Sequence, residues 1–256
     1  MLKLLLAHLK KTRRTSFRLI VAALPVLYSA LLFLYYFAVQ KTGSHPTDEY
    51  RTFFLFLTIA VQFTAGIMIV LFIQIDKDAG NFGNELRIGI SRFKLLTSKF
   101  LFQFCLLIFV EILATSTFYL LQVIFRNSKI SIQEISLFLF VNILLMLPIL
   151  IMYLWSAYQF DLTGTVIVGI IFTLSGILMG TTDLGGSHWI FLPPTWGIKA
   201  VYELVPSSIW LAGTAQHTAH QLIIQIICVS LAVSIIFFAF LFVWYNKWEG
   251  KRNLEE

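Results

Sequence analysis

Charged residues and glycines are concentrated in residues 76–99, between two apolar runs that are each long enough to cross a bilayer. The segment reads DKDAGNFGNELRIGISRFKLLTSK, and it carries both signs of charge. Its charged residues are Asp76, Asp78 and Glu85 together with Lys77, Arg87, Arg92, Lys94 and Lys99. Mixed charge favours contact with a complementary protein surface over an anchor on lipid head groups. A solvated loop whose cations only set the topology is the alternative.

The order of residues in this segment predicts two helices separated by a turn. Residues 78–87 have acidic side chains early and Arg87 late, which suits the dipole of a short helix. Gly89 is expected to follow its last turn, and Ser91 is expected to cap a second helix that runs into the next apolar run.

A second set of polar residues lies inside the apolar runs. A charged carboxylate at Glu111 would cost about 2.5 to 3.5 kcal/mol on the lipid face, so we expect it to face protein or water, or to be protonated. Thr115 and Gln122 follow on the same helical face, and Gln62 lies in the preceding run, near Gly66. A helix contact held by hydrogen bonds is the favoured interpretation, with close packing at Gly66. The alternative interpretation is that these polar residues line a path for a cationic peptide.

Other chemistry has little support in the sequence. Cys105 and Cys228 lie in apolar runs and are interpreted as apolar filler. His217 and His220 are interpreted as a polar cap, because further metal ligands are not found nearby. The sequence has no phosphate-binding loop, nucleophile elbow or His-Glu-x-x-His motif. We therefore expect no enzyme activity, metal or cofactor in this chain.

Composition places these residues in a membrane protein. The chain is 58% apolar and 12% charged, against about 25% charged in soluble domains. Backbone groups in a bilayer must be paired within the segment, so we expect an all-α integral membrane fold in one domain, residues 1–256. Six runs reach the length of about 20 residues that a crossing helix needs. They are residues 19–39, 53–75, 100–125, 135–158, 162–180 and 221–245.

Three connecting segments are expected to have structure of their own. Residues 181–220 contain apolar pieces too short to cross and broken by prolines, which predicts a broken hairpin of short re-entrant or interfacial helices on the outside. The link after residue 158 holds Asp161 and Thr163, either of which could cap the fifth helix. Residues 1–18 have leucines near helical spacing, which predicts an amphipathic helix along the inner leaflet; a disordered basic stub is the alternative. Its basic residues are Lys3, Lys10, Lys11, Arg13 and Arg14.

The distribution of Lys and Arg predicts the orientation. With the N-terminus inside, 14 of these residues lie on the cytoplasmic side and 5 on the other. We therefore expect the chain to lie in the plasma or inner membrane of a cell. Both of its termini are expected in the cytoplasm. This topology also accounts for the net charge of +6, so the charge gives no case for a nucleic-acid partner.

The run from Gly80 to Lys99 resembles the pattern that type-2 ABC transporter permeases carry after their second helix. In that family an acidic, glycine-containing segment precedes a small-Ser-Arg turn and a Lys at the start of the third helix. The likeness extends over the whole chain, from the amphipathic N-terminal helix to the broken outer hairpin. Pro193, Pro194 and Trp196, together with the length, make the chain most similar to permeases of lantibiotic immunity and peptide resistance. Ile88-Gly89-Ile90 departs from the family, which often has an acidic residue and a proline there.

The resemblance implies that residues 76–99 are a cytoplasmic coupling segment docking on a separate ATP-binding subunit, present as a dimer. Asp78, Gly80, Asn81 and Glu85 would lie on or near the coupling helix, bordered by Arg87, Arg92, Lys94 and Lys99. A second permease chain, identical or similar, would complete the path, and ATP and Mg would bind to the partner. The implied function is export of a hydrophobic or cationic peptide of the lantibiotic type. A lipid, drug or ion as cargo, or a membrane enzyme or scaffold using Glu111, are the alternatives.

Overall fold

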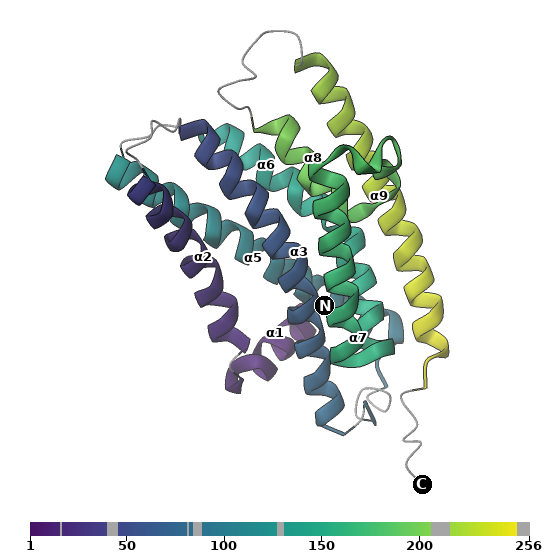
Figure 1. Cartoon of the computed structure of the whole chain (residues 1–256). Helices are drawn as coiled ribbons and strands as arrows, with labels where there is room; N and C mark the ends of the chain where they lie inside the picture. Colours follow the sequence, from purple (N-terminus) through teal and green to yellow (C-terminus); the bar gives the residue numbers. More distant parts are fainter. Residues whose placement is uncertain are drawn as a thin grey trace.

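The computed structural model describes residues 1–15, 17–39, 46–80, 82–83, 89–126, 131–205 and 216–249, and nearly all of them are helical (Figure 1). The α-helices are α1 (Leu2–Lys11), α2 (Phe17–Val39), α3 (Pro46–Asp78), α5 (Arg92–Arg126), α6 (Ile132–Leu145), α7 (Leu147–Thr181), α8 (Pro193–Leu204) and α9 (Gln216–Lys247). The described residues also form the 3-10 turns η1 (Thr12–Arg14), η3 (Asp183–Gly185) and η4 (His188–Phe191). The described part contains no strand, so the expected all-α class is confirmed.

Within the described residues, five helical stretches are long and apolar enough to cross a bilayer. They are Phe17–Ala38, Asp48–Asp78, Arg92–Arg126, Ile132–Thr181 and Gln221–Lys247. Their most apolar windows have mean hydropathies from 2.1 to 3.0, and each stretch exceeds the roughly 20 residues that a bilayer core requires. The chain therefore has the helices of a multi-pass membrane protein.

The stretch Ile132–Thr181 contains a break at Asp161. Its 50 residues would extend about 75 Å as one straight helix, more than twice the thickness of a bilayer core. Asp161 has φ 58° and ψ −157°, which lie outside the helical region and interrupt α7. The sequence predicted separate helices over 135–158 and 162–180, and this break falls between the two.

The central pair of the bundle is α3 and α7, which approach closely at a glycine. A Cβ added to Gly66 of α3 would lie 2.9 Å from the ring of Tyr153 on α7. The expected close packing at Gly66 is therefore confirmed. On the other side, α2 packs along α5, where the Ser29 hydroxyl donates to the carbonyl oxygen of Ala114 at 2.7 Å. In Figure 1, α2 and α9 lie at opposite edges of the bundle.

The short helix α8 packs inside the bundle against α3, α6 and α7. It begins at Pro193 and Pro194, whose missing N–H groups and fixed φ suit the first turn of a helix. Trp196 is 1% exposed, and its Nε1 donates to the carbonyl oxygen of Ile190 at 3.0 Å. The prediction of a short helix in 181–220 is thus confirmed for α8, whereas residues 206–215 lie outside the described residues.

Helix α1 lies crosswise at the end of the bundle where α3 and α5 meet (Figure 1). Leu2, Leu6 and Leu9 are exposed, as are Lys3 and Lys10. One face of α1 therefore presents apolar and basic side chains together, while the opposite face packs on the bundle. Of the other basic residues predicted here, Lys11 is half-buried and Arg13 is exposed; the side chain of Arg14 lies outside the described residues.

Candidate functional site

Asp76, in the last turn of α3, lies between two cations. Its Oδ1 is 2.6 Å from Lys11 Nζ of α1, and its Oδ2 is 2.9 Å from Lys99 Nζ of α5. Lys99 also donates to the hydroxyl of Tyr158 on α7, at 2.7 Å. These four residues join α1, α3, α5 and α7 at one end of the bundle, and we call them the Asp76 junction.

A further ion pair lies beside this junction. Lys77 follows Asp76 in α3, and its Nζ lies 3.1 Å from Oδ2 of Asp161, the residue at the break in α7. Both side chains are about one third exposed, so this pair is worth less than a buried one. It nevertheless places the end of α3 directly against the break.

Phe82 anchors the segment that follows α3. Its side chain is 1% exposed, and its ring centroid lies 4.9 Å from that of Trp248 and 5.7 Å from that of Tyr158. Tyr245 and Trp244 complete this group, which we call the Phe82 cluster. The φ of Phe82 is +63°, a conformation that costs a bulky residue on the order of 1 to 3 kcal/mol. Burial of the ring offsets that cost.

Arg92, the first residue of α5, binds the end of α9. Its Nη1 donates to the carbonyl oxygens of Tyr245, Asn246 and Trp248 at 3.0, 2.7 and 2.8 Å. The last carbonyls of a helix lack partners within it, and the negative end of the helix dipole attracts a cation. Arg92 therefore caps α9 from outside.

The local turn between these anchors agrees with the sequence analysis at two points. Gly89 has φ +69°, as expected of a residue that follows a helix end. The backbone N–H of Lys94 donates to Ser91 Oγ at 3.4 Å, as expected of a helix cap at Ser91. Half of the helix predicted over 78–87 lies outside the described residues, which include 78–80 and 82–83 of it. In these described residues the prediction of a helix that begins at Asp78 is wrong, because α3 ends at Asp78 and the φ angles of Gly80 and Phe82 are +131° and +63°.

The predicted interface residues divide into an outer and an inner set. Asp78, Gly80 and Lys94 are exposed. Lys99 is 1% exposed within the Asp76 junction, and Arg92 is half-buried against α9, so both bind the bundle itself. Asn81, Glu85 and Arg87 lie outside the described residues.

His8 holds α1 against this end of the bundle, although no motif in the sequence predicted this role. His8 Nε2 lies 3.0 Å from Ser98 Oγ of α5, and the ring packs against those of Phe72 and Phe102. The spacing of Leu5, His8 and Thr12 places them on one helical face, and this was the sequence signal that could have indicated a buried His8.

A polar cluster lies halfway along the helices. Glu111 of α5 is fully buried, and its Oε1 accepts a hydrogen bond from Asn142 Nδ2 of α6 at 3.0 Å. The hydroxyl of Thr58 on α3 donates to Asn142 Oδ1 at 3.4 Å. Gln62 lies one turn after Thr58 on α3, Thr115 lies one turn after Glu111 on α5, and both side chains are also buried. We call these five residues the mid-helix cluster.

Gln122, predicted to share a stripe with Glu111, belongs to a separate cluster. Its Nε2 donates to Glu49 Oε2 at 2.8 Å, and Arg126 forms an ion pair with the same carboxylate. Arg126 also donates to the carbonyl oxygen of Tyr36 at 2.8 Å. Eleven residues of helix separate Gln122 from Glu111, about 16 Å along α5.

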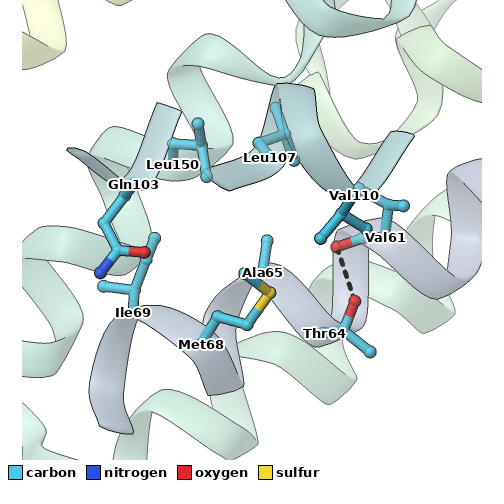
Figure 2. Close-up of a pocket in the computed structure, with 9 residues that line it drawn as sticks. All are labelled: Val61, Thr64, Ala65, Met68, Ile69, Gln103, Leu107, Val110 and Leu150. Carbon is cyan, nitrogen blue, oxygen red and sulfur yellow. Dashed lines mark hydrogen bonds between the residues drawn. The ribbon is translucent and has the colours of Figure 1, made fainter. Parts of the chain in front are cut away.

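Two cavities adjoin along α3. Figure 2 shows the smaller, of about 10 Å³, where apolar side chains of α3 face Leu107, Val110 and Leu150, with Gln103 as a polar wall. The larger, of about 230 Å³, lies between α2 and α3 and is lined almost entirely by apolar side chains. A cavity of this kind suits an apolar chain rather than a polar ligand.

Comparison with known proteins gives no family assignment. No protein-family model matches the chain, and no curated protein shows significant similarity to it.

Proposed function

We propose that this chain is the membrane-spanning permease subunit of a type-2 ABC exporter, driven by a separate ATP-binding subunit. One observation carries the proposal. The exposed residues Asp78, Gly80 and Lys94 belong to a segment that is fixed to four membrane-length helices. The fixing contacts are those of the Asp76 junction, the Phe82 cluster and Arg92.

These contacts suit the transmission of movement. A force on the exposed side would act on α3 and α5 through the ion pair of Asp76 and Lys99. It would act on α7 and α9 through Phe82, because that ring packs against Tyr158 and Trp248. A loop that only connected two crossings would not need anchors on four helices, so the arrangement favours the docking interpretation over the solvated loop.

The proposed topology has six crossings with both termini in the cytoplasm. The stretch Ile132–Thr181 would cross twice and turn at Asp161. Six crossings put the end of α3, the start of α5, the break in α7 and the end of α9 on one side of the membrane. Contacts of Lys77 with Asp161 and of Arg92 with Tyr245 support this assignment. Helix α1 would lie in the inner leaflet at the same side.

The proposed cargo is a hydrophobic or cationic peptide of the lantibiotic type. The apolar cavity of about 230 Å³ between α2 and α3 supports an apolar cargo, because it offers an apolar segment a place beside the bundle. The working unit would contain two permease chains and two ATP-binding subunits, with ATP and Mg bound to the latter.

A site-specific cross-link tests the docking surface. In the test variant, a photoreactive amino acid replaces the exposed Lys94. In the matched control it replaces Glu203, which is exposed on α8. After illumination of intact cells, mass spectrometry identifies the attached protein. We expect an ATP-binding subunit with a phosphate-binding loop on the Lys94 variant alone. Its absence there, or equal attachment to both variants, would overturn the proposal.

Charge reversal tests whether docking is coupled to transport. Asp78→Lys with Lys94→Glu is expected to abolish ATP hydrolysis stimulated by cargo in the purified complex, because both exposed charges then oppose their partners. Glu134→Lys, exposed at the start of α6, is the control and should retain stimulation. Full stimulation in the double variant would exclude a role for these residues in coupling.

A further inference from the structure

Three buried side chains at mid-helix depth have polar atoms without a hydrogen-bond partner in the described part of the chain. These atoms are Glu111 Oε2, Thr115 Oγ1 and both polar atoms of the Gln62 side chain. Each of the three residues is at most 3% exposed. Buried polar groups are nearly always satisfied, so such a group of orphaned atoms indicates a missing ligand or water.

The surrounding backbone closes tightly over this group. A Cβ added to Gly197 of α8 would lie 2.9 Å from Asn142 Oδ1 and 2.7 Å from Thr58 Cγ2. A Cβ added to Gly176 of α7 would lie 3.4 Å from the Gln62 amide. Because glycine has no side chain at these two positions, the backbones of α7 and α8 can pack directly against the polar side chains. Bulk solvent is therefore kept from the cluster, although a small ligand has partners there.

No cation is among the side chains that the described contacts place around Glu111. The hydrogen-bonded side chains are that of Asn142 from α6 and, through Asn142, that of Thr58 from α3. Gln62 lies one turn from Thr58 on α3, and its backbone carbonyl oxygen accepts a hydrogen bond from the Tyr153 hydroxyl of α7. On α5 itself the nearest cations are Lys99 and Arg126, about 18 and 22 Å away along the helix axis. An unpaired, buried carboxylate is strongly disfavoured relative to the neutral acid. Glu111 is thus arranged to hold a proton.

We propose that Glu111 is a reversible proton-binding site at the centre of the bundle, and that Gln62 and Thr115 hold the water with which it exchanges. Oε2 carries the proton, since Oε1 already accepts from Asn142. On release the O–H bond of the acid breaks and the proton passes to this water as hydronium. The carboxylate that remains keeps the hydrogen bond from Asn142. The proposal does not depend on the cargo or on the ATP-binding subunit.

Infrared spectroscopy of the purified full-length chain in lipid bilayers tests this directly. We expect a protonated-carboxyl C=O band that is absent in Glu111→Gln, shifts in heavy water, and loses intensity as the pH is raised. Absence of any band that depends on Glu111 would overturn the proposal. So would a band that neither titrates nor shifts in heavy water, because its proton would then be fixed.

Two further variants keep the test decisive if Glu111→Gln fails to fold. Glu111→Asp keeps the acid and should move the band, which assigns it without removing the carboxyl group. Gln62→Leu should leave the band in place but slow its hydrogen–deuterium exchange by about tenfold, because the bridging water loses a partner. Gln133→Leu, exposed on α6, is the matched control. Equal exchange in Gln62→Leu and Gln133→Leu would contradict the assigned water.

Discussion

Lys99 Nζ lies 2.9 Å from an Asp76 carboxylate oxygen, so an ion pair joins the end of α3 to the first turns of α5. The segment between these two residues contains the exposed positions 78, 80 and 94. Its two ends are therefore held together inside the bundle while Asp78, Gly80 and Lys94 are exposed.

We expect Lys99→Met to lower the stability of the chain in detergent, because Asp76 then keeps Lys11 as its remaining partner within the junction. A double-mutant cycle with Asp76→Asn should give a coupling energy of about 0.5 to 3 kcal/mol. Thermal unfolding of the four proteins measures it, and Lys94→Met, at an exposed position, serves as the control. Equal destabilisation by Lys94→Met and Lys99→Met would contradict the ion-pair account.

Phe82→Ala should destabilise the chain by about 3 to 5 kcal/mol, the usual cost of truncating a buried aromatic residue. Its ring is buried against Tyr158 and Trp248, so the cavity left behind cannot fill without moving α7 or α9. Phe191→Ala removes a ring that is 79% exposed and should have little effect. Thermal unfolding compares the two, and a Phe82→Ala protein as stable as Phe191→Ala would show that this ring is not an anchor.

Gly197→Ala should cost about 1 to 3 kcal/mol through overpacking, because the added methyl group meets Thr58 and Asn142 at less than 3 Å. The matched control is Gly83→Ala, where an added Cβ meets nothing within 4 Å. Denaturant titration in the same detergent measures both. A Gly197→Ala protein with unchanged stability would mean that α8 does not close over the mid-helix cluster.

Arg92→Ala should loosen the end of α9, since three carbonyl oxygens lose their donor. We expect backbone amide exchange in residues 241–248 to become roughly tenfold faster, as the loss of a capping interaction of about 1 kcal/mol or more predicts. Hydrogen–deuterium exchange with mass spectrometry reads this out, with Lys94→Ala as the control. Unchanged exchange in that peptide would count against the capping role.

The sequence alone predicted features that local chemistry determines. The burial of Glu111 followed from the cost of a carboxylate in lipid, and the turn at Gly89 and Ser91 followed from backbone and capping preferences. The break near residue 161 was predictable because a short link separates the apolar runs 135–158 and 162–180.

Pairings between distant residues were not predictable in the same way. Asp76 and Lys99 look like solvated charges in the sequence, because only the packing of α3 on α5 and α7 makes them neighbours. Gln122 was expected on the same helical face as Glu111, but its hydrogen bond to Glu49 of α3 was not predicted. The reason is that α3 begins at Pro46, seven residues before the apolar run, so its polar first turns extend alongside the end of α5.

Attachment of α1 through His8 imposes an order on the assembly of the chain. Its partner Ser98 lies 90 residues later, which a ribosome working at about 5 to 20 residues per second reaches roughly 5 to 20 seconds afterwards. During that interval α1 exists without the surface that buries its histidine. In the proposed topology, the face bearing Leu2, Leu6 and Leu9 would bind the membrane surface during this interval, and the final docking of α1 would be a late event in biogenesis although α1 is synthesised before the other helices.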